Sequence, residues 1–97
     1  MVKWNEKMVM FGEPLTVNGK DATLKSLCIN ALGAFFEDER QLEAVEKMNR
    51  FKLSLKIDAE GELTPDEIVM LKKCVAKMYA PNVMGLIWSI VDPTTLV

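Results

Sequence analysis

The stretch that decides the fold starts at Thr64-Pro65-Asp66-Glu67 and runs on as TPDEIVMLKKCVAKMYA over residues 64–80. It opens with a complete set of helix start signals: a capping hydroxyl, a proline at the first helical position and a glutamate at the third. The apolar residues after it recur every three or four positions, at Ile68, Leu71, Val75, Met78 and Tyr79, with Cys74 beside them. This is the helical period, so the sequence predicts a helix over residues 64–80 with one apolar face.

A second helix follows at once, over residues 82–91. Pro81 opens this helix, and the residues after the proline are apolar nearly all round. A helix of that kind is either buried in the core or in contact with a partner. The sequence leaves both alternatives open.

Upstream, residues 40–57 predict another helix, which competes with a strand signal. Helical spacing is kept by Leu42, Val45, Met48, Phe51 and Leu55. Residues 51–57, however, alternate between apolar and polar side chains, as an amphipathic strand does. We favour the helix because leucine and lysine are good helix formers, and because no turn signal interrupts the run. The choice between helix and strand for residues 51–57 stays open at this stage.

The first predicted helix spans residues 23–36 and is expected to be central. Asp21 or Thr23 is its cap. Its broad apolar stripe consists of Leu24, Leu27, Cys28, Ala31, Leu32 and Phe35, widened by Ile29 and Phe36. Gly33 and the acidic residues 37–39 indicate its end.

Residues 1–22 predict β-like structure. Met8 to Phe11 form an apolar run closed by Gly12 and Pro14, which suits a short strand or an extended arm. Asn18-Gly19 is a favoured pair for a tight hairpin turn. The whole chain, residues 1–97, is therefore expected to be a single mainly α domain: four helices with a short N-terminal β-hairpin or extended arm.

Composition argues against several classes of function. The 97 residues include no histidine, and 12 basic side chains face 14 acidic ones, for a net charge of −2. No imidazole is available as a catalytic base or metal ligand, and a near-neutral chain lacks the basic footprint of a nucleic-acid binder. We therefore expect no catalytic residue, no cofactor, no small-molecule substrate and no nucleic-acid partner.

The two cysteines and the apolar segments indicate a cytoplasmic protein. Cys28 and Cys74 each lie among apolar neighbours, which favours buried free thiols in a reducing compartment over a disulfide. Charged residues interrupt the N-terminal apolar stretch, unlike a signal peptide. The longest uncharged run, residues 78–91, is too short to span a membrane.

The acidic segment from Asp58 to Glu67 can be aligned with a calcium-binding EF-hand loop. In that alignment Lys56 falls on the first loop position, where a carboxylate is needed. A helix capping box accounts for Thr64 and Glu67 without a metal. We favour the capping box and predict no metal ligand, with ion binding by this turn left open.

Large apolar side chains near both ends of the chain are candidate partner contacts. Their ordinary place is the core, but tryptophan and methionine are also enriched at interfaces. The residues predicted to contact a protein partner are Trp4, Phe11, Tyr79, Met84 and Trp88.

Several short segments together form a wider pattern. They are Gly19-Lys20, Thr23-Leu24-Lys25, Asn30-Ala31-Leu32, KMNRFKLSLKI over residues 47–57, Leu63-Thr64 with Glu67-Ile68, and Lys77, Tyr79, Pro81, Val83 and Gly85 at alternate positions. With these, residues 15–92 resemble a set of small proteins encoded by tailed bacteriophages and prophages. The resemblance implies a phage origin and the cytoplasm of a bacterial host, and it assigns no catalytic or binding residue.

Two functions are compatible with these observations. One is a non-enzymatic interaction protein that binds and modulates a host or defence protein. The alternative is a structural or assembly component of the phage particle that acts as a homo-oligomer.

Overall fold

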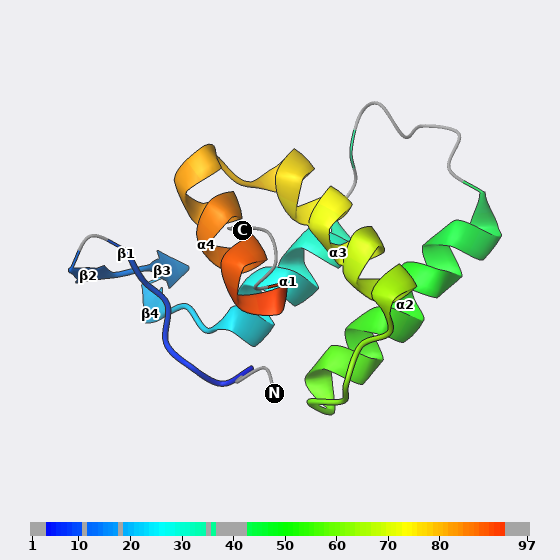
Figure 1. Cartoon of the computed structure of the whole chain (residues 1–97), viewed down its shortest axis with the longest axis horizontal. Helices are drawn as coiled ribbons and strands as arrows, with labels where there is room; N and C mark the ends of the chain where they lie inside the picture. The colour runs from blue at the N-terminus through cyan, green and yellow to red at the C-terminus, as the bar shows by residue number, and fades with distance from the viewer. Residues whose placement is uncertain (1–3, 11, 18, 35, 37–42, 93–97) are drawn as a thin grey trace.

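The structure is a computed structural model that describes residues 4–10, 12–17, 19–34, 36 and 43–92. Four two-residue strands come first, β1 (Val9–Met10), β2 (Glu13–Pro14), β3 (Thr16–Val17) and β4 (Lys20–Asp21); four helices follow, α1 (Leu24–Gly33), α2 (Ala44–Asp58), α3 (Pro65–Met78) and α4 (Pro81–Val91). The predicted mainly α fold is confirmed. Figure 1 shows the strands at one side of the molecule, α2 at the other side, and α1, α3 and α4 between them.

The helix boundaries differ from the predicted ones at several ends. The helix expected over residues 23–36 ends at Gly33, and Ala34 is extended. The helix expected over 40–57 begins at Ala44 and continues to Asp58, with residues 40–42 outside the described part. The last helix starts at Pro81, because a proline at the first helical position removes no intrahelical hydrogen bond.

Helix α1 lies at the centre and packs against both α2 and α3. It is capped by Thr23, whose hydroxyl accepts from the Ser26 N–H at 3.1 Å. The next free donors, the N–H groups of Leu24 and Lys25, are taken by carbonyls of residues 6 and 4 at 3.2 and 2.8 Å. The N-terminal segment and the Thr23 hydroxyl thus supply hydrogen-bond acceptors for the N–H groups in the first turn of α1.

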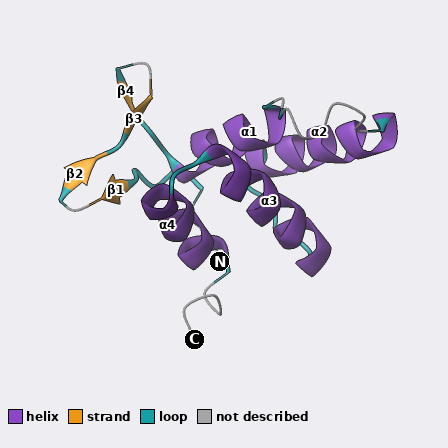
Figure 2. Cartoon of the chain, turned by 90° about the horizontal axis from the view of Figure 1, so that it is seen from above, coloured by secondary structure: helices purple, strands orange, loops and turns teal. Residues whose placement is uncertain are grey.

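The N-terminal arm, meaning the described residues from Trp4 to Ala22, is organised around a ring of three backbone hydrogen bonds. Met8 N–H donates to Ala22, Leu15 N–H to Met8, and Ala22 N–H to Leu15, at 2.9, 2.8 and 2.8 Å. Three antiparallel pairings extend from this ring: β1 with β2, β3 with β4, and the single bridge of Lys7 with Thr23. Figure 2 shows the two hairpins projecting on the same side of the helices.

β3 and β4 pair as the predicted hairpin requires, while Asn18 of the predicted Asn18-Gly19 turn lies outside the described residues. Thr16 pairs with Asp21 and Val17 with Lys20, and Gly19 has a φ of +79°, which the turn requires. Met8 and Ala22, each 2% exposed, pack into the core. The hairpins are short, so this packing is what fixes them to the helices.

Helices α3 and α4 are joined by one lysine and one tryptophan. The Lys72 ammonium lies 4.5 Å from the centre of the Trp88 ring and 3.0 Å from the Asp92 carboxylate. The Trp88 indole N–H donates to the Lys72 carbonyl at 3.1 Å.

Among the residues described, no helix combines the length and the apolar character that crossing a membrane requires.

Candidate protein-binding surface

One side of α2 carries a row of exposed apolar side chains. Val45, Met48, Phe51 and Leu55 are 69%, 50%, 56% and 54% exposed. Their spacing of three, three and four places them on one side of the helix. We call these four residues the outer face of α2.

The opposite side of α2 is the one that packs. Arg50, Leu53 and Ile57 are its buried residues, and we call them the inner face. Successive helical residues are about 100° apart, so residues two positions apart lie about 200° apart, on opposite sides. Helix α2 is therefore apolar on two opposite sides.

This arrangement explains the ambiguous segment from Phe51 to Ile57. The segment is helical, as we favoured. Its apolar residues alternate with polar ones because Phe51 and Leu55 point outward while Leu53 and Ile57 point inward. The row from Val45 to Leu55, which kept the helical spacing in the sequence, is exposed instead of packed; Leu42 lies outside the described residues.

The outer face is open because α2 lies at the edge of the helical layer. Its close helix packing is against α1, while α3 packs against α1 and α4. Figures 1 and 2 both show α2 as the outermost helix, on the side away from the hairpins. Inner-face side chains are buried, whereas each of the four outer-face side chains is at least 50% exposed.

The outer face has a basic border. Lys47 and Lys52 are exposed and fall on opposite sides of the apolar row. Lys56, one turn further on, contacts the Glu67 carboxylate at 2.7 Å. Over its length, α2 carries four basic side chains against two acidic ones.

Two shallow hollows accompany α2. One, of about 290 Å³, lies between α2 and the end of α1 and includes Leu32, Lys47 and Phe51 in its lining. The other, of about 190 Å³, lies between α2 and α3 and includes Glu46 and Val69. The first of these hollows borders the outer face at Phe51 and offers space for a side chain of a partner, whereas the second lies on the side of Arg50.

Nothing matches: no family model, no curated protein and no solved structure aligns with the chain. The exposure, spacing and charge of its own residues therefore characterise this surface.

The residues predicted as partner contacts do not gather at the outer face. Trp4 is 2% exposed, so its side chain belongs to the core and offers almost no surface to a partner. Phe11 lies outside the described residues. Tyr79, Met84 and Trp88 are half-buried against the core, and their contact role stays a prediction.

Two of these half-buried side chains have internal partners. The Tyr79 hydroxyl donates to the Leu27 carbonyl, which joins the end of α3 to α1. Burial raises the pKa of Tyr79 to about 12, with a smaller contribution from Cys28. Trp88 is held by Lys72 as described above.

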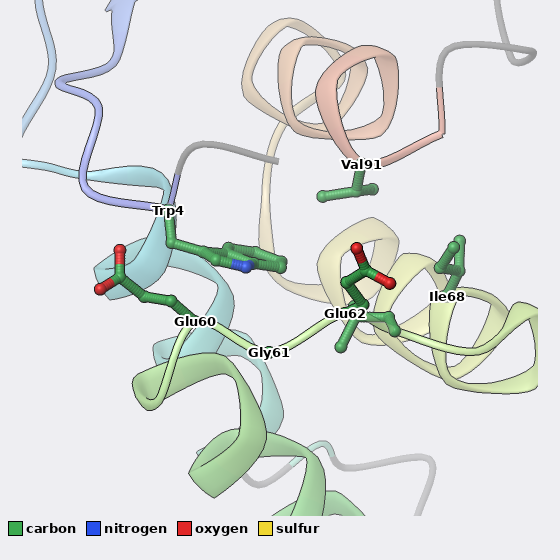
Figure 3. A pocket seen from close by; sticks show the side chains of 7 residues that line it. Trp4, Glu60, Gly61, Glu62, Ile68 and Val91 are labelled. Atoms are coloured by element: carbon green, nitrogen blue, oxygen red, sulfur yellow. The ribbon is translucent and has the colours of Figure 1, made fainter. Parts of the chain in front are cut away.

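A cleft of about 250 Å³ lies where the arm meets the start of α3. Trp4, Leu63, Ile68 and Val91 give it an apolar lining. Figure 3 shows the Trp4 ring extending across it and the Glu60 carboxylate turned away from it. That carboxylate accepts from the Asn5 amide at 2.8 Å and lies 4.0 Å from the Lys25 ammonium, so it ties the arm to the end of α2.

The loop from Asp58 to Glu67 forms helix ends. Gly61 N–H donates to the Lys56 carbonyl and Glu60 N–H to the Ile57 carbonyl, which closes α2, with Glu60 at a φ of 59°. Thr64 and Glu67 form the predicted capping box of α3. Within the described ranges, no group of three or more acidic or cysteine side chains is placed to hold a metal ion.

Both cysteines are buried thiols. Burial raises the pKa of the Cys28 thiol to about 12, which keeps it protonated at neutral pH. A protonated buried thiol is a poor nucleophile, because the thiolate is the reactive form.

Proposed function

We propose that the chain is a non-enzymatic protein that binds another protein through the outer face of α2. The observation that carries this proposal is the exposure of Val45, Met48, Phe51 and Leu55, each at least 50% exposed, on one side of one helix. Single exposed apolar residues are ordinary on protein surfaces. A contiguous row at helical spacing is typical of a contact surface instead.

The composition of the row fits a protein contact. Methionine and aromatic residues are enriched in the cores of protein interfaces, and Met48 and Phe51 occupy its middle. The polar residues that flank them, Lys47 and Lys52, would form the rim that such interfaces have.

The chemistry of the chain supports a non-enzymatic role. There is no histidine in the sequence, and the Cys28 thiol has a pKa raised to about 12. A nucleophile needs a base beside it or a lowered pKa. Cys28 lacks both an imidazole partner and a lowered pKa, so binding is the better-supported activity.

The resemblance to phage and prophage proteins supports a partner in the bacterial cytoplasm. A phage protein that binds and modulates a host or defence protein needs an exposed contact surface and no active site. The outer face supplies such a surface on a helix that is anchored to the core by Leu53 and Ile57.

A second candidate function uses the same face. An apolar row on an edge helix also suits self-association, as in a structural or assembly component of the phage particle that acts as a homo-oligomer. The oligomeric state in solution distinguishes this candidate from the first.

The test is affinity capture from bacterial lysate with the wild type and two variants. Met48→Gln with Phe51→Gln makes the outer face polar, and Met78→Gln is the matched control on α3, where the side chain is 43% exposed. We expect a protein retained by the wild type and the control to be lost with the double variant. Equal capture by all three would contradict the proposal.

Light scattering on the same three proteins tests the second candidate. A wild-type oligomer that the double variant converts to a monomer would support self-association. A wild-type monomer would exclude it. Circular dichroism of each variant serves as the control that its helices are kept.

A further inference from the structure

We infer that the occupant of the outer face is an amphipathic helix of a different protein, with acidic side chains bordering its apolar row. This inference rests on the proposed function and adds the chemistry of the partner. Three observations carry it: the shape of the face, its basic border and the consequences of pairing it with a second copy.

The shape of the outer face suits a helix. From Val45 to Leu55 the row spans eleven residues, a length of about 15 Å, or nearly three turns. Helices recognise helices through apolar side chains at spacings of three, four and seven. The hollow of about 290 Å³ beside Phe51 provides space next to the outer face for an anchoring side chain of the partner.

The charge around the face selects an acidic partner. Exposed Lys47 and Lys52 lie on either side of the apolar row. The whole chain has a net charge of −2, yet α2 has four basic side chains against two acidic ones. Arg50 belongs to the buried inner face and Lys56 contacts Glu67, so Lys47 and Lys52 are the basic side chains that border the exposed row. Carboxylates flanking a partner's apolar row would meet them.

The same charge disfavours a second copy as the occupant. A two-fold interface brings the same patch of each copy together. Lys52 borders the outer face near the middle of its length, so pairing with a second copy brings the two Lys52 ammonium groups, and the neighbouring Lys47 groups, toward one another. Like charges facing each other oppose association, and an acidic helix removes that cost.

The experiment uses two synthetic helical peptides as probes. Both have about 18 residues, long enough to form a helix, with leucines at spacings of three and four. Glutamates flank the leucine row in one peptide, and lysines flank it in the other. Binding to the full chain is measured by fluorescence anisotropy at low salt and again at high salt.

We expect the glutamate peptide to bind about tenfold more tightly than the lysine peptide, because two charge pairs form at the rim. Salt should reduce this preference. Lys47→Glu with Lys52→Glu should reverse it, while Lys20→Glu, a change on exposed β4 at the other side of the molecule, should leave it intact. Circular dichroism of each variant confirms that the fold is kept.

Each contrary outcome identifies what fails. Equal binding of both peptides, lost in Met48→Gln with Phe51→Gln, would overturn the acidic partner and leave the proposed function standing. Absence of binding by either peptide, together with capture from lysate that the double variant does not change, would overturn both. A wild-type dimer that blocks peptide binding would show a second copy as the occupant and overturn the inference.

Discussion

At the residue scale, Glu67 shows how one side chain joins two helices. Its carboxylate accepts from the Thr64 backbone N–H at 2.8 Å and from the Lys56 ammonium at 2.7 Å. The first contact caps α3, and the second ties that cap to the last turn of α2. The Lys56 contact is the main reason why the pKa of Glu67 lies below its ordinary value of 4.5, followed by the Thr64 backbone contact.

This lowered pKa makes a prediction about stability and pH. A carboxyl whose pKa is lower in the folded state stabilises the fold above its unfolded pKa, and that contribution is lost as the pH falls through the folded pKa. Glu67→Gln keeps an acceptor for the Thr64 N–H but loses the charge that Lys56 meets. We expect the wild type to be more stable at neutral pH, with the difference shrinking below about pH 4.5 and vanishing at lower pH.

The measurement is urea unfolding of the wild type and of Glu67→Gln between pH 3 and pH 7, from which the free energy of unfolding is obtained at each pH. Glu62→Gln is the matched control, because Glu62 is exposed in the same loop outside the capping box. The difference in free energy of unfolding between the wild type and Glu67→Gln is expected to be smaller at pH 3 than at pH 7. If the two differences agree to within about 0.3 kcal/mol, the role of the charge is contradicted.

Some residue positions could be predicted from sequence and others could not. The capping box of Thr64 and Glu67 depends only on residues three apart, so the local sequence is sufficient to predict it. The burial of Trp4 depends on the arm folding back onto α1, where the Lys25 N–H donates to the Trp4 carbonyl at 2.8 Å. That contact joins residues far apart in the chain, and no local pattern specifies it.

At the scale of the element, α2 has two apolar faces and packs only one of them closely. The sequence predicts its helical spacing but cannot tell which side is buried, because the apolar residues on both sides are of types that are common in cores. Leu53 and Leu55 are the same amino acid two positions apart, yet Leu53 is 2% exposed and Leu55 54%. The arrangement of α1 decides which row is buried, and that is a property of the tertiary fold.

Alanine substitutions at these two leucines test the orientation of α2. Leu53→Ala removes buried methyl groups and should lower the free energy of unfolding by about 2–5 kcal/mol. Leu55→Ala acts on an exposed side chain and should change it by less than about 0.5 kcal/mol. Chemical denaturation of both variants is the measurement.

The comparison has a built-in control, because both substitutions place the same alanine in the same helix and change helix propensity equally. In a strand, residues 53 and 55 would lie on one face and the two costs would be similar. Similar costs in the experiment would therefore contradict the helical assignment of this segment. A larger cost at Leu55 would contradict the orientation of the two faces.

At the scale of the whole molecule, the arm and the helices share one core. Trp4, Met8 and Ala22 from the arm are buried in the same cluster as Leu24, Leu71 and Ile87 from the helices. The arm also supplies the carbonyls that accept from the first N–H groups of α1. Strands of two residues are not stable by themselves, so the arm depends on the helices, and the start of α1 depends on the arm.

This mutual dependence predicts that the arm and the helices unfold together. The chain has two tryptophans, so Trp88→Phe leaves Trp4 as the only one and makes fluorescence a probe of the arm. That variant loses the indole N–H that donates to the Lys72 carbonyl and should be less stable by about 1 kcal/mol. In urea, its Trp4 fluorescence and its far-ultraviolet circular dichroism should nevertheless change at the same midpoint, as a two-state transition requires.

The reciprocal variant, Trp4→Phe, places the fluorescent probe on α4 and serves as the control. In that protein too, fluorescence and circular dichroism should coincide, because Trp88 lies against the core that the helices share. A Trp4 transition at lower urea than the loss of helix would show that the arm detaches first, as an independent unit of lower stability. In that case the ring of Met8, Leu15 and Ala22 would be an appendage to the helices, and the start of α1 would be stable without it.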